Sequence, residues 1–526
     1  NLHVLATSRE PLGVPGETVW RLSPLSVVPA DRDLPYTTLA GTEGVRLFAD
    51  RAGAIVPDFR LGEENIAAVA QICWRLDGIP LAIELAAARV EILSPEEIAD
   101  RLGDRFRLLV NGLRTAPTRQ QTLRTTLDWS YELLSERERR AFECLSVFAG
   151  SFNLAAVTAI LTTDAGVRID RSEIDVVASL VAKSFVQVAD PERNETRYRL
   201  LETVRAYGLE RLGARDDVHM VRRRYAHWAL AFVKEAESRV HGTEQSRWLR
   251  RVARELPNLE GALGWAVESR EVDLALSLAG AQAWYWFHAI YGSAAHGLLW
   301  LERALSLAEA RDVPHVRLKA LAGIALLSMT QGAREAAWAW IQEELALAEE
   351  VKDDAGLLAA QGGIAQYLLM TGAFEEAERV AGNTLELARK LDETWVTVIL
   401  LSNQAYCALH RGDVVRARCC FMAGADLARE KGDTWSLAMA LGQLGDLERA
   451  EGAHDRAGTL YQESLSLNET LGLGGRSPSL LHNLGYVALA RDRTSEANGY
   501  FTEALMQFQS RGDRRGVAEA ALSHPT

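Results

Sequence analysis

A small residue, usually glycine, recurs every forty residues in the second half of the chain. The units begin at Gly332, Gly372, Gly412 and Gly452, and a fifth keeps the spacing with Asp492. An alanine stands five residues after each of these positions, at Ala337, Ala377, Ala417, Ala457 and Ala497. Another small residue recurs upstream, at Ala325, Ala365, Ala405, Gly445 and Gly485. A fixed period of this length predicts a solenoid, in which each unit buries its apolar face against its neighbours.

Each unit is long enough for two helices and two short connections. Gly332 and its equivalents would supply a left-handed cap between the helices, and the alanine would let the helices pack closely. Gly292 and Leu305 fall on the same register, so we place the start of the solenoid near residue 280. Trp395 and Trp435 also share a register position, and we interpret them as core between repeats rather than as a ligand platform. Because solenoids bind partners along a curved surface, this half is predicted to be a receptor surface.

Length and composition are those of an ordinary globular protein with several domains. The chain has 526 residues, of which 48% are hydrophobic and 25% charged, and it is too long for one core. The net charge of −13 disfavours a broad nucleic-acid-binding surface. The five cysteines form no CxxC motif, which is typical of a reducing compartment, and no apolar run is long enough to span a bilayer. We therefore expect a cytoplasmic protein with no membrane partner.

The N-terminal part combines one predicted strand with several predicted helices. Residues 2–7 read as a short buried strand, and Arg9 follows it closely. A single strand cannot fold alone, so we expect its sheet partners before residue 1 or in another chain. Further predicted helices span residues 45–52, 63–76 and 81–90. Trp74 is predicted on the buried face of the second of these, Gly78 ends that helix, and Pro80 opens the third.

A winged-helix domain is predicted in the middle of the chain. Residues 121–134 are predicted to be helical, and Ser135 and Glu138 form a capping box at the start of the next helix. Residues 184–188 and 197–201 alternate like two strands around a polar turn. Three helices followed by such a hairpin are typical of a winged helix.

Four stretches carry motifs that are specific to one group of proteins. They are LATSREPLGVPGE (5–17), RLDGIPLAIELAAAR (75–89), LDWSYELLSERERRAFECLSVFAGSF (127–152) and RYRLLETVRAYGLERL (197–212). Together they resemble the STAND class of NB-ARC-like regulatory ATPases, in the branch of the large bacterial LuxR-, AfsR- and MalT-type transcriptional regulators. The resemblance implies a P-loop domain, a helical domain and a winged helix that close over ATP or ADP with Mg²⁺. It also implies a superhelix of TPR-like repeats that senses an inducer, and a separate domain that reads DNA.

The resemblance nominates three residues for nucleotide binding and leaves one family feature unmatched. Arg9 would be the sensor arginine that reaches the γ-phosphate, which suits a guanidinium at the end of a strand. Gly78 and Pro80 match the GxP motif, in which the proline packs on the adenine side; a helix cap followed by a helix start explains them equally well. Relatives place a Met-His-Asp motif on the β-phosphate, but here the aligned residues are Leu200, Leu201 and Glu202. Glu202 is interpreted as a cap of the following helix.

The chain lacks the motifs that phosphoryl transfer requires. It contains no GxxxxGK[ST] and no apolar strand ending in paired acids for Mg²⁺. We nominate no catalytic residue and no metal ligand, and we do not expect this chain to hydrolyse ATP. The simplest expectation is a regulator that lacks its N-terminal P-loop part. An arginine cluster at residues 137–140 alternates with glutamates, which indicates a solvated face rather than a DNA-reading helix.

The predicted fold is therefore mostly α, with a remnant of an α/β nucleotide domain. The predicted domains are 1–35 (last strand and exit loop), 36–115 (helical domain with GxP), 116–215 (winged helix), 216–280 (helical linker) and 281–526 (TPR-like superhelix). The predicted function is a signal-responsive transcriptional regulator of STAND ATPase type, whose repeats bind a protein or small-molecule inducer and which self-associates on activation. DNA would be bound only by a domain outside this chain. The alternative is a non-enzymatic repeat scaffold for protein–protein interaction, and an active NTPase would require upstream residues.

Overall fold

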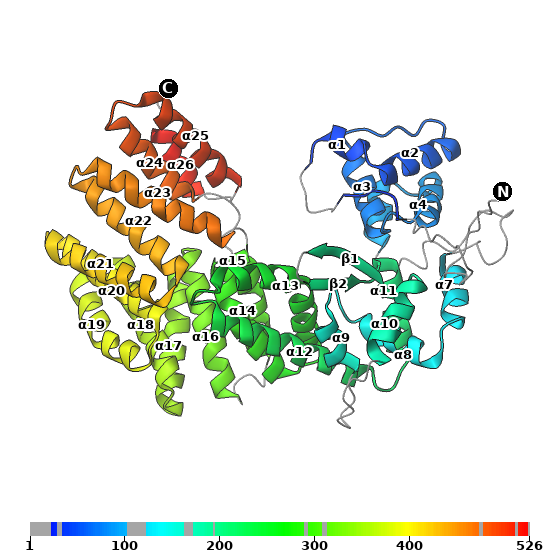
Figure 1. Cartoon of the computed structure of the whole chain (residues 1–526), viewed down its shortest axis with the longest axis horizontal. Helices are drawn as coiled ribbons and strands as arrows, with labels where there is room; N and C mark the ends of the chain where they lie inside the picture. Colours follow the sequence, from blue (N-terminus) through cyan, green and yellow to red (C-terminus); the bar gives the residue numbers. More distant parts are fainter. Residues whose placement is uncertain are drawn as a thin grey trace, which may run out of the picture. The chain divides into compact units, whose positions relative to one another are not determined.

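The computed structural model divides the chain into two compact units, residues 1–225 and 226–526. It describes residues 23–28, 34–102, 123–161, 172–192, 195–288, 293–307, 313–472, 477–510 and 514–523. These residues form helices and a single two-stranded sheet (Figure 1). None of the described helices is long and apolar enough to cross a membrane. The predicted strand at residues 2–7 lies outside the described residues.

The first unit begins with a small group of helices. They are α1 (Tyr36–Ala40), α2 (Glu43–Ile55), α3 (Ile66–Arg75), α4 (Pro80–Ala87), the 3₁₀ turn η1 (Ala88–Glu91) and α5 (Pro95–Arg101). Phe48 of α2 and Ile72 and Cys73 of α3 are fully buried between them. The prediction that Trp74 is buried is wrong, because this side chain is 43% exposed. Successive helical residues point about 100° apart, so Trp74 turns away from the face that Cys73 buries.

The winged helix follows in the first unit, as predicted. Its elements are α7 (Leu123–Glu132), α8 (Glu136–Leu145), α9 (Leu154–Leu161), α10 (Ser172–Ala182), β1 (Gln187–Glu192), β2 (Glu195–Arg199) and α11 (Glu202–Gly213). The capping box of Ser135 and Glu138 starts α8. The strands pair antiparallel with Gln187 opposite Arg199, and Phe152 adds a β-bridge to Tyr198.

The second unit is helical throughout its described residues. It contains α12 (Val218–Arg239, of which the unit takes the part from Ala226), α13 (Gln245–Glu268), α14 (Val272–His288) and α15 (Ser293–Leu305). The repeat helices follow as α16 (Pro314–Thr330), α17 (Arg334–Val351), α18 (Asp354–Thr371), α19 (Phe374–Lys390), α20 (Thr394–His410), α21 (Val414–Lys431), α22 (Thr434–Ala450), α23 (His454–Leu471), α24 (Pro478–Leu489), α25 (Thr494–Ser510) and α26 (Arg514–Ser523). The predicted solenoid of helix pairs is thus confirmed.

Residues with a left-handed backbone conformation separate the repeat helices every twenty residues. The predicted set, Gly332, Gly372, Gly412, Gly452 and Asp492, all have positive φ. A second set stands midway, at Lys352, Asp392, Gly432 and Gly472, and these residues also have positive φ. The register alanines Ala337, Ala377, Ala417, Ala457 and Ala497 are all fully buried. A left-handed residue ends one helix and turns the chain into the next, which explains the period.

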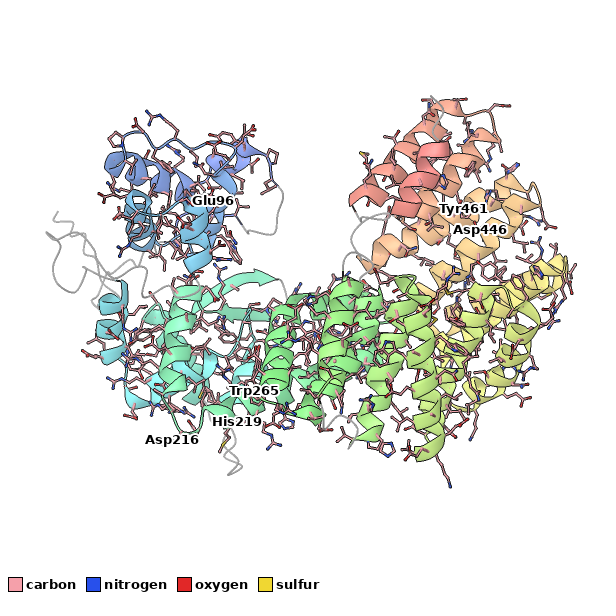
Figure 2. All side chains as sticks on the ribbon, turned by 180° about the vertical axis from the view of Figure 1, so that it is seen from behind. Glu96, Asp216, His219, Trp265, Asp446 and Tyr461 are labelled. Atoms are coloured by element: carbon pink, nitrogen blue, oxygen red, sulfur yellow. The ribbon has the colours of Figure 1, made fainter. Side chains whose placement is uncertain are left out.

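Small residues in the repeats make room for aromatic rings of the next helix. A Cβ added to Gly445 would lie 2.6 Å from the Tyr461 ring, and one added to Gly485 would lie 2.5 Å from the Phe501 ring. The Tyr461 hydroxyl donates a hydrogen bond of 2.7 Å to Asp446, and Figure 2 labels both residues. These contacts join α22 to α23 and α24 to α25.

Candidate functional site

The structure places two of the three nominated nucleotide-binding residues. Gly78 is buried and has φ +66°, and its carbonyl accepts a 2.9 Å hydrogen bond from the amide of Leu25. A Cβ at Gly78 would lie 2.1 Å from the Leu25 carbonyl oxygen, so both handedness and space require glycine. Pro80 is exposed and is the first residue of α4. Arg9 lies outside the described residues.

These placements fit a nucleotide only in part. The exposed ring of Pro80 is available to pack against a base, whereas Gly78 is covered by Leu25. Neither residue offers a group that would hold phosphates. The described residues also contain no group of acids, histidines or cysteines arranged to hold a metal ion. Nucleotide binding at Arg9, Gly78 and Pro80 therefore stays a prediction.

Asp77, which directly precedes Gly78, caps a helix of the winged-helix domain. Its Oδ2 accepts hydrogen bonds from the backbone amide and the hydroxyl of Thr203, at 2.9 and 3.1 Å. Thr203 lies in the first turn of α11, where no side chain of the helix's own N-cap, Leu201, supplies a cap. Glu202, the first residue of α11, pairs with Arg205 at 2.8 Å. Burial raises the pKa of Asp77, against the lowering effect of its hydrogen bonds.

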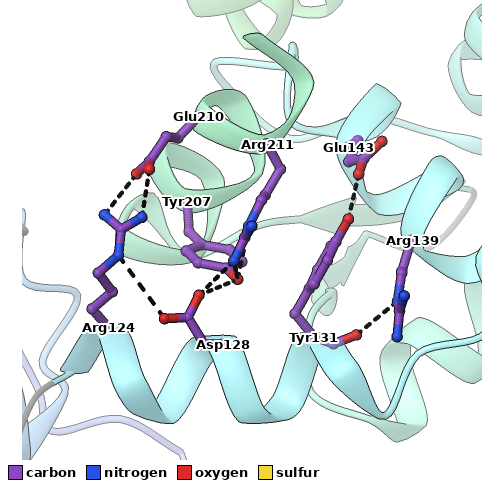
Figure 3. Close-up of polar contacts among 8 residues, drawn as sticks. All are labelled: Arg124, Asp128, Tyr131, Arg139, Glu143, Tyr207, Glu210 and Arg211. Carbon is purple, nitrogen blue, oxygen red and sulfur yellow. Dashed lines mark hydrogen bonds and ion pairs between the residues drawn. The ribbon is translucent and has the colours of Figure 1, made fainter. Parts of the chain in front are cut away.

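Further along α11, side chains of this helix pair with α7 through a network of charged and phenolic groups (Figure 3). Asp128 of α7 accepts from the Tyr207 hydroxyl at 2.7 Å and from Arg211 at 2.6 Å. Arg124 donates to both carboxylate oxygens of Glu210, at 3.1 and 2.6 Å. Burial, with Asp128 close by, raises the pKa of Tyr207, so the phenol stays protonated and donates.

A buried carboxylate of α8 extends this network. Glu143 is 1% exposed and accepts two hydrogen bonds of 3.0 Å from Arg215, which follows α11. It also accepts a hydrogen bond from the hydroxyl of Tyr131 in α7. The guanidinium of Arg211 lies 5.0 Å above the Tyr131 ring. Helices α7, α8 and α11 are therefore joined by paired charges. Removing one partner of a buried pair leaves the other charge uncompensated, so such a network is stable only when it is complete.

We call Asp77, Thr203, Asp128, Tyr207 and Arg211 the α11 junction. It brings together three of the stretches that carried the family resemblance, residues 75–89, 127–152 and 197–212. Sequence reasoning missed all five residues as a site. The one sequence feature that could have indicated this site is Asp77, an acid directly before a glycine with positive φ. Its partner Thr203 lies 126 residues away, so the sequence alone does not pair them.

The helix that would read DNA in a winged helix carries no positive charge here. The sequence of α10, SEIDVVASLVA, contains no lysine or arginine, and Glu173 and Asp175 lie in its first turn. In α8, Arg139 donates to the Tyr131 carbonyl at 3.1 Å and Arg140 pairs with Asp217. Direct readout of bases uses donors such as arginine and lysine. These residues instead serve contacts within the domain.

Comparison with known proteins supports the winged-helix assignment. Residues 134–213 match the winged helix-turn-helix domain family. A Mycobacterium tuberculosis protein named "Putative HTH-type transcriptional regulator" is 44% identical over 333 residues, which cover 62% of this chain and 35% of that protein. A second M. tuberculosis protein, named as uncharacterized, is 40% identical over 224 residues, or 43% of this chain and 53% of that protein. This chain is homologous to both. It spans about a third of the length of the first of them.

One solved structure aligns with most of this chain. The STAND protein with a tetratricopeptide repeat sensor from Pyrococcus horikoshii aligns over 84% of this chain and 61% of its own chain. The TM-score is 0.49 and the sequence identity 17%.

Proposed function

We propose that this chain is the switch and sensor part of a signal-responsive transcriptional regulator of STAND ATPase type, of the LuxR/AfsR/MalT branch. The α11 junction carries this proposal. One helix takes its N-terminal cap from the helical domain, through Asp77, and packs its side chains against α7. Movement of the helical domain away from α11 would therefore break a buried cap and expose the first turn of that helix.

Such a contact suits a switch because it has two discrete states. With the cap in place, the Asp77 carboxylate accepts a hydrogen bond from the amide of Thr203. Without the cap, the carboxylate and the amide must each hydrogen-bond to water. In the proposed cycle, ATP or ADP with Mg²⁺ would bind chiefly to residues outside the described part of the chain. Arg9 and Pro80 would be this chain's contribution, one facing the phosphates and the other the base. The repeats would sense an inducer or a partner, and the protein would act in the cytoplasm and self-associate on activation.

A second candidate function is DNA binding by the winged helix itself. The match of residues 134–213 to a winged helix-turn-helix family favours it. The lack of basic residues on α10 favours an intramolecular role instead, with DNA bound by another domain. The third candidate is a repeat scaffold that binds proteins and regulates no genes.

Transcript analysis of the encoding organism tests these alternatives. Disruption of the gene is expected to change a defined set of transcripts. An Asp77→Ala allele is expected to alter the same set regardless of growth condition, because the cap that holds the resting state is lost. Asp58→Ala, an exposed aspartate of the same helical domain, is the matched control and should behave as wild type.

The outcomes separate the three functions. Unchanged transcripts after gene disruption would rule out the regulator and leave the scaffold. Retention of a promoter fragment by the purified chain, lost on truncation of the β1–β2 hairpin, would favour DNA binding by the winged helix.

A further inference from the structure

One face of the repeat helix α21 carries an exposed apolar stripe. This helix packs against α20 and α22 (Figure 1). On its solvent side, Val415 is 74% exposed and Met422 is 50% exposed, and Cys419 is exposed between them. Positions i, i+4 and i+7 lie on one face of a helix, so these side chains form a continuous stripe, which the exposed Ala423 widens. We call these four residues the α21 stripe.

The repeat itself does not explain the apolar side chains of the stripe. The second helix of each repeat pair holds polar or small residues at the same register positions. The residues equivalent to Val415 are Glu335, Glu375, Asp455 and Ser495, and those equivalent to Met422 are Gln342, Gly382, Gln462 and Thr502. Val415 and Met422 are therefore not needed to build the solenoid. Single exposed apolar residues are ordinary on protein surfaces, whereas a group of them on one face indicates a partner.

The two register tryptophans, in contrast, offer no such surface. Trp395 and Trp435 are half-buried, and both rings lie against Phe287 of α14, at centroid distances of 5.9 and 5.5 Å. They contact the chain before the repeats and not only neighbouring repeats, which corrects the interpretation of these residues as core between repeats.

Four exposed charges flank the α21 stripe in a mirrored order. Asp413 and Arg416 lie at the start of α21, and Asp426 and Arg429 lie in its second half. Asp413 and Arg429 each stand eight positions from Phe421, and Arg416 and Asp426 each stand five. A two-fold axis level with Phe421 would therefore bring an acid opposite a base at each of these positions. This order of charges is self-complementary, as an isologous interface requires.

The present partners of these charges leave them available to a second molecule. Asp426 and Arg429 pair with each other at 3.1 Å, but their side chains are 72% and 52% exposed. Arg416 contacts Glu378 at 2.9 Å, and Glu378 keeps Arg411 as a second partner. Because exposed ion pairs contribute little to stability, exchanging them for pairs with another molecule costs little.

We propose that α21 is a dimerisation helix. It packs antiparallel against α21 of a second copy of this chain, around a two-fold axis level with Phe421. Met422 and Cys419 lie at the centre of the contact, and the four charges pair across its rim, as in protein interfaces with an apolar centre and a polar edge. This inference goes beyond the proposed function, because it names the surface of self-association and depends on neither nucleotide nor DNA.

The dimer should form reversibly. A standard interface buries about 800 Å² on each partner, which is more than one helix face supplies. Association should therefore depend on concentration. Sedimentation velocity of the purified chain over a range of concentrations is expected to show a shift from monomer to dimer.

Charge reversal tests the pairing. Arg416→Glu places an acid opposite Asp426 of the second copy, and Asp426→Arg places a base opposite Arg416. Because each pair occurs twice in a symmetric dimer, either substitution should weaken association about tenfold or more. The double variant, Arg416→Glu with Asp426→Arg, restores opposite charges and should associate within about threefold of wild type.

Two further variants separate the stripe from general surface effects. Met422→Gln introduces the residue that two other repeats hold at this position, Gln342 and Gln462, so folding should be preserved. It should weaken association about threefold or more, because it removes apolar contact area. Arg334→Glu, at an exposed arginine that starts α17, is the matched control and should associate as wild type does. Circular dichroism would show that all variants remain folded.

A chain that stays monomeric at every concentration would overturn the proposal and leave the stripe to a different protein. Association that Arg416→Glu does not weaken, or that the double variant fails to restore, would also reject it. These measurements use the purified chain alone. A monomeric chain would leave the transcript tests of the proposed function unaffected, and unchanged transcripts after gene disruption would leave the dimer in place.

Discussion

Among single residues, Glu344 departs clearly from the pattern of its own repeats. The equivalent positions in the later repeats hold small residues, Thr384, Gly424, Ser464 and Ala504. Glu344 is 1% exposed, its Oε1 has no partner within the described residues, and burial raises its pKa to about 8. A carboxyl group is thus held largely neutral in a packing position at neutral pH.

Replacing Glu344 with glutamine should make the repeats less sensitive to pH. The folded-state pKa is raised above the unfolded value of about 4.5, so the contribution of Glu344 to stability is fully present below pH 4.5 and is lost as pH rises to about 8. Glu344→Gln removes this decline, which has a limiting slope of about 1.4 kcal/mol per pH unit. Denaturant unfolding between pH 5 and 8, followed by hydrogen exchange in α16–α18, would measure this pH dependence of stability. The exposed Glu349→Gln on the same helix should behave as wild type, and parallel pH profiles would contradict the prediction.

Three glycine substitutions should separate backbone handedness from crowding. The Cβ added by Gly412→Ala would have no atom within 4 Å, so the loss of about 1 kcal/mol in the free energy of unfolding would come from the positive φ alone. Gly78→Ala adds a clash with the Leu25 carbonyl and should cost about 2–4 kcal/mol. Gly53→Ala, in the last turn of α2, has open space and should stabilise by up to about 1 kcal/mol. Equal hydrogen-exchange changes in α2–α5 for Gly78→Ala and Gly53→Ala would refute this ranking.

The same residues show what sequence could and could not predict at this scale. Gly332 and its equivalents are predictable, because glycine favours the left-handed region and its spacing is fixed. Lys352 and Asp392 occupy the same conformation without being glycine, so the second left-handed set escaped detection. Trp74 was misplaced because one residue along a helix changes the face.

Among elements, α11 depends on a cap from a distant helix. The existence of α11 followed from its sequence, whereas the Asp77 cap did not, because a contact across 126 residues leaves no local pattern. The same holds for the pairing of Asp128 with Tyr207 and Arg211. Charged residues on a predicted helix look solvated until the neighbouring helix is known.

Removing the Asp77 carboxylate should loosen the first turn of α11. Asp77→Ala is expected to cost about 0.5–2 kcal/mol, the usual effect of losing an N-cap. Asp77→Asn keeps an accepting oxygen and should cost less, because asparagine also caps helices. Hydrogen exchange of the amides at 202–205 should be fastest in the alanine variant, slower in the asparagine variant and slowest in wild type. Identical protection in all three proteins would mean that the cap does not hold this helix.

At the scale of the whole molecule, the winged helix and the repeats were predictable and the packing within the second unit was not. Periodicity predicted the repeats, and the capping box and hairpin predicted the winged helix. Neither predicted that the start of α13 would contact α22, where Asp433 lies 188 positions after Gln245. In a simple solenoid each repeat contacts only its neighbours, so sequence period alone implies local contacts.

Gln245→Ala tests whether this long-range contact holds the second unit together. The substitution leaves the amide of Trp435 without its acceptor and removes one of the two donors to Asp433 Oδ1, at an expected cost of about 1–3 kcal/mol. Hydrogen exchange should then increase both at 240–246 and at 433–436, while repeats between them stay protected. Gln342→Ala, at an exposed glutamine of α17, is the control and should change neither segment. An increase confined to 240–246 would show that the repeats hold their shape without α13, as a solenoid with only neighbour contacts would.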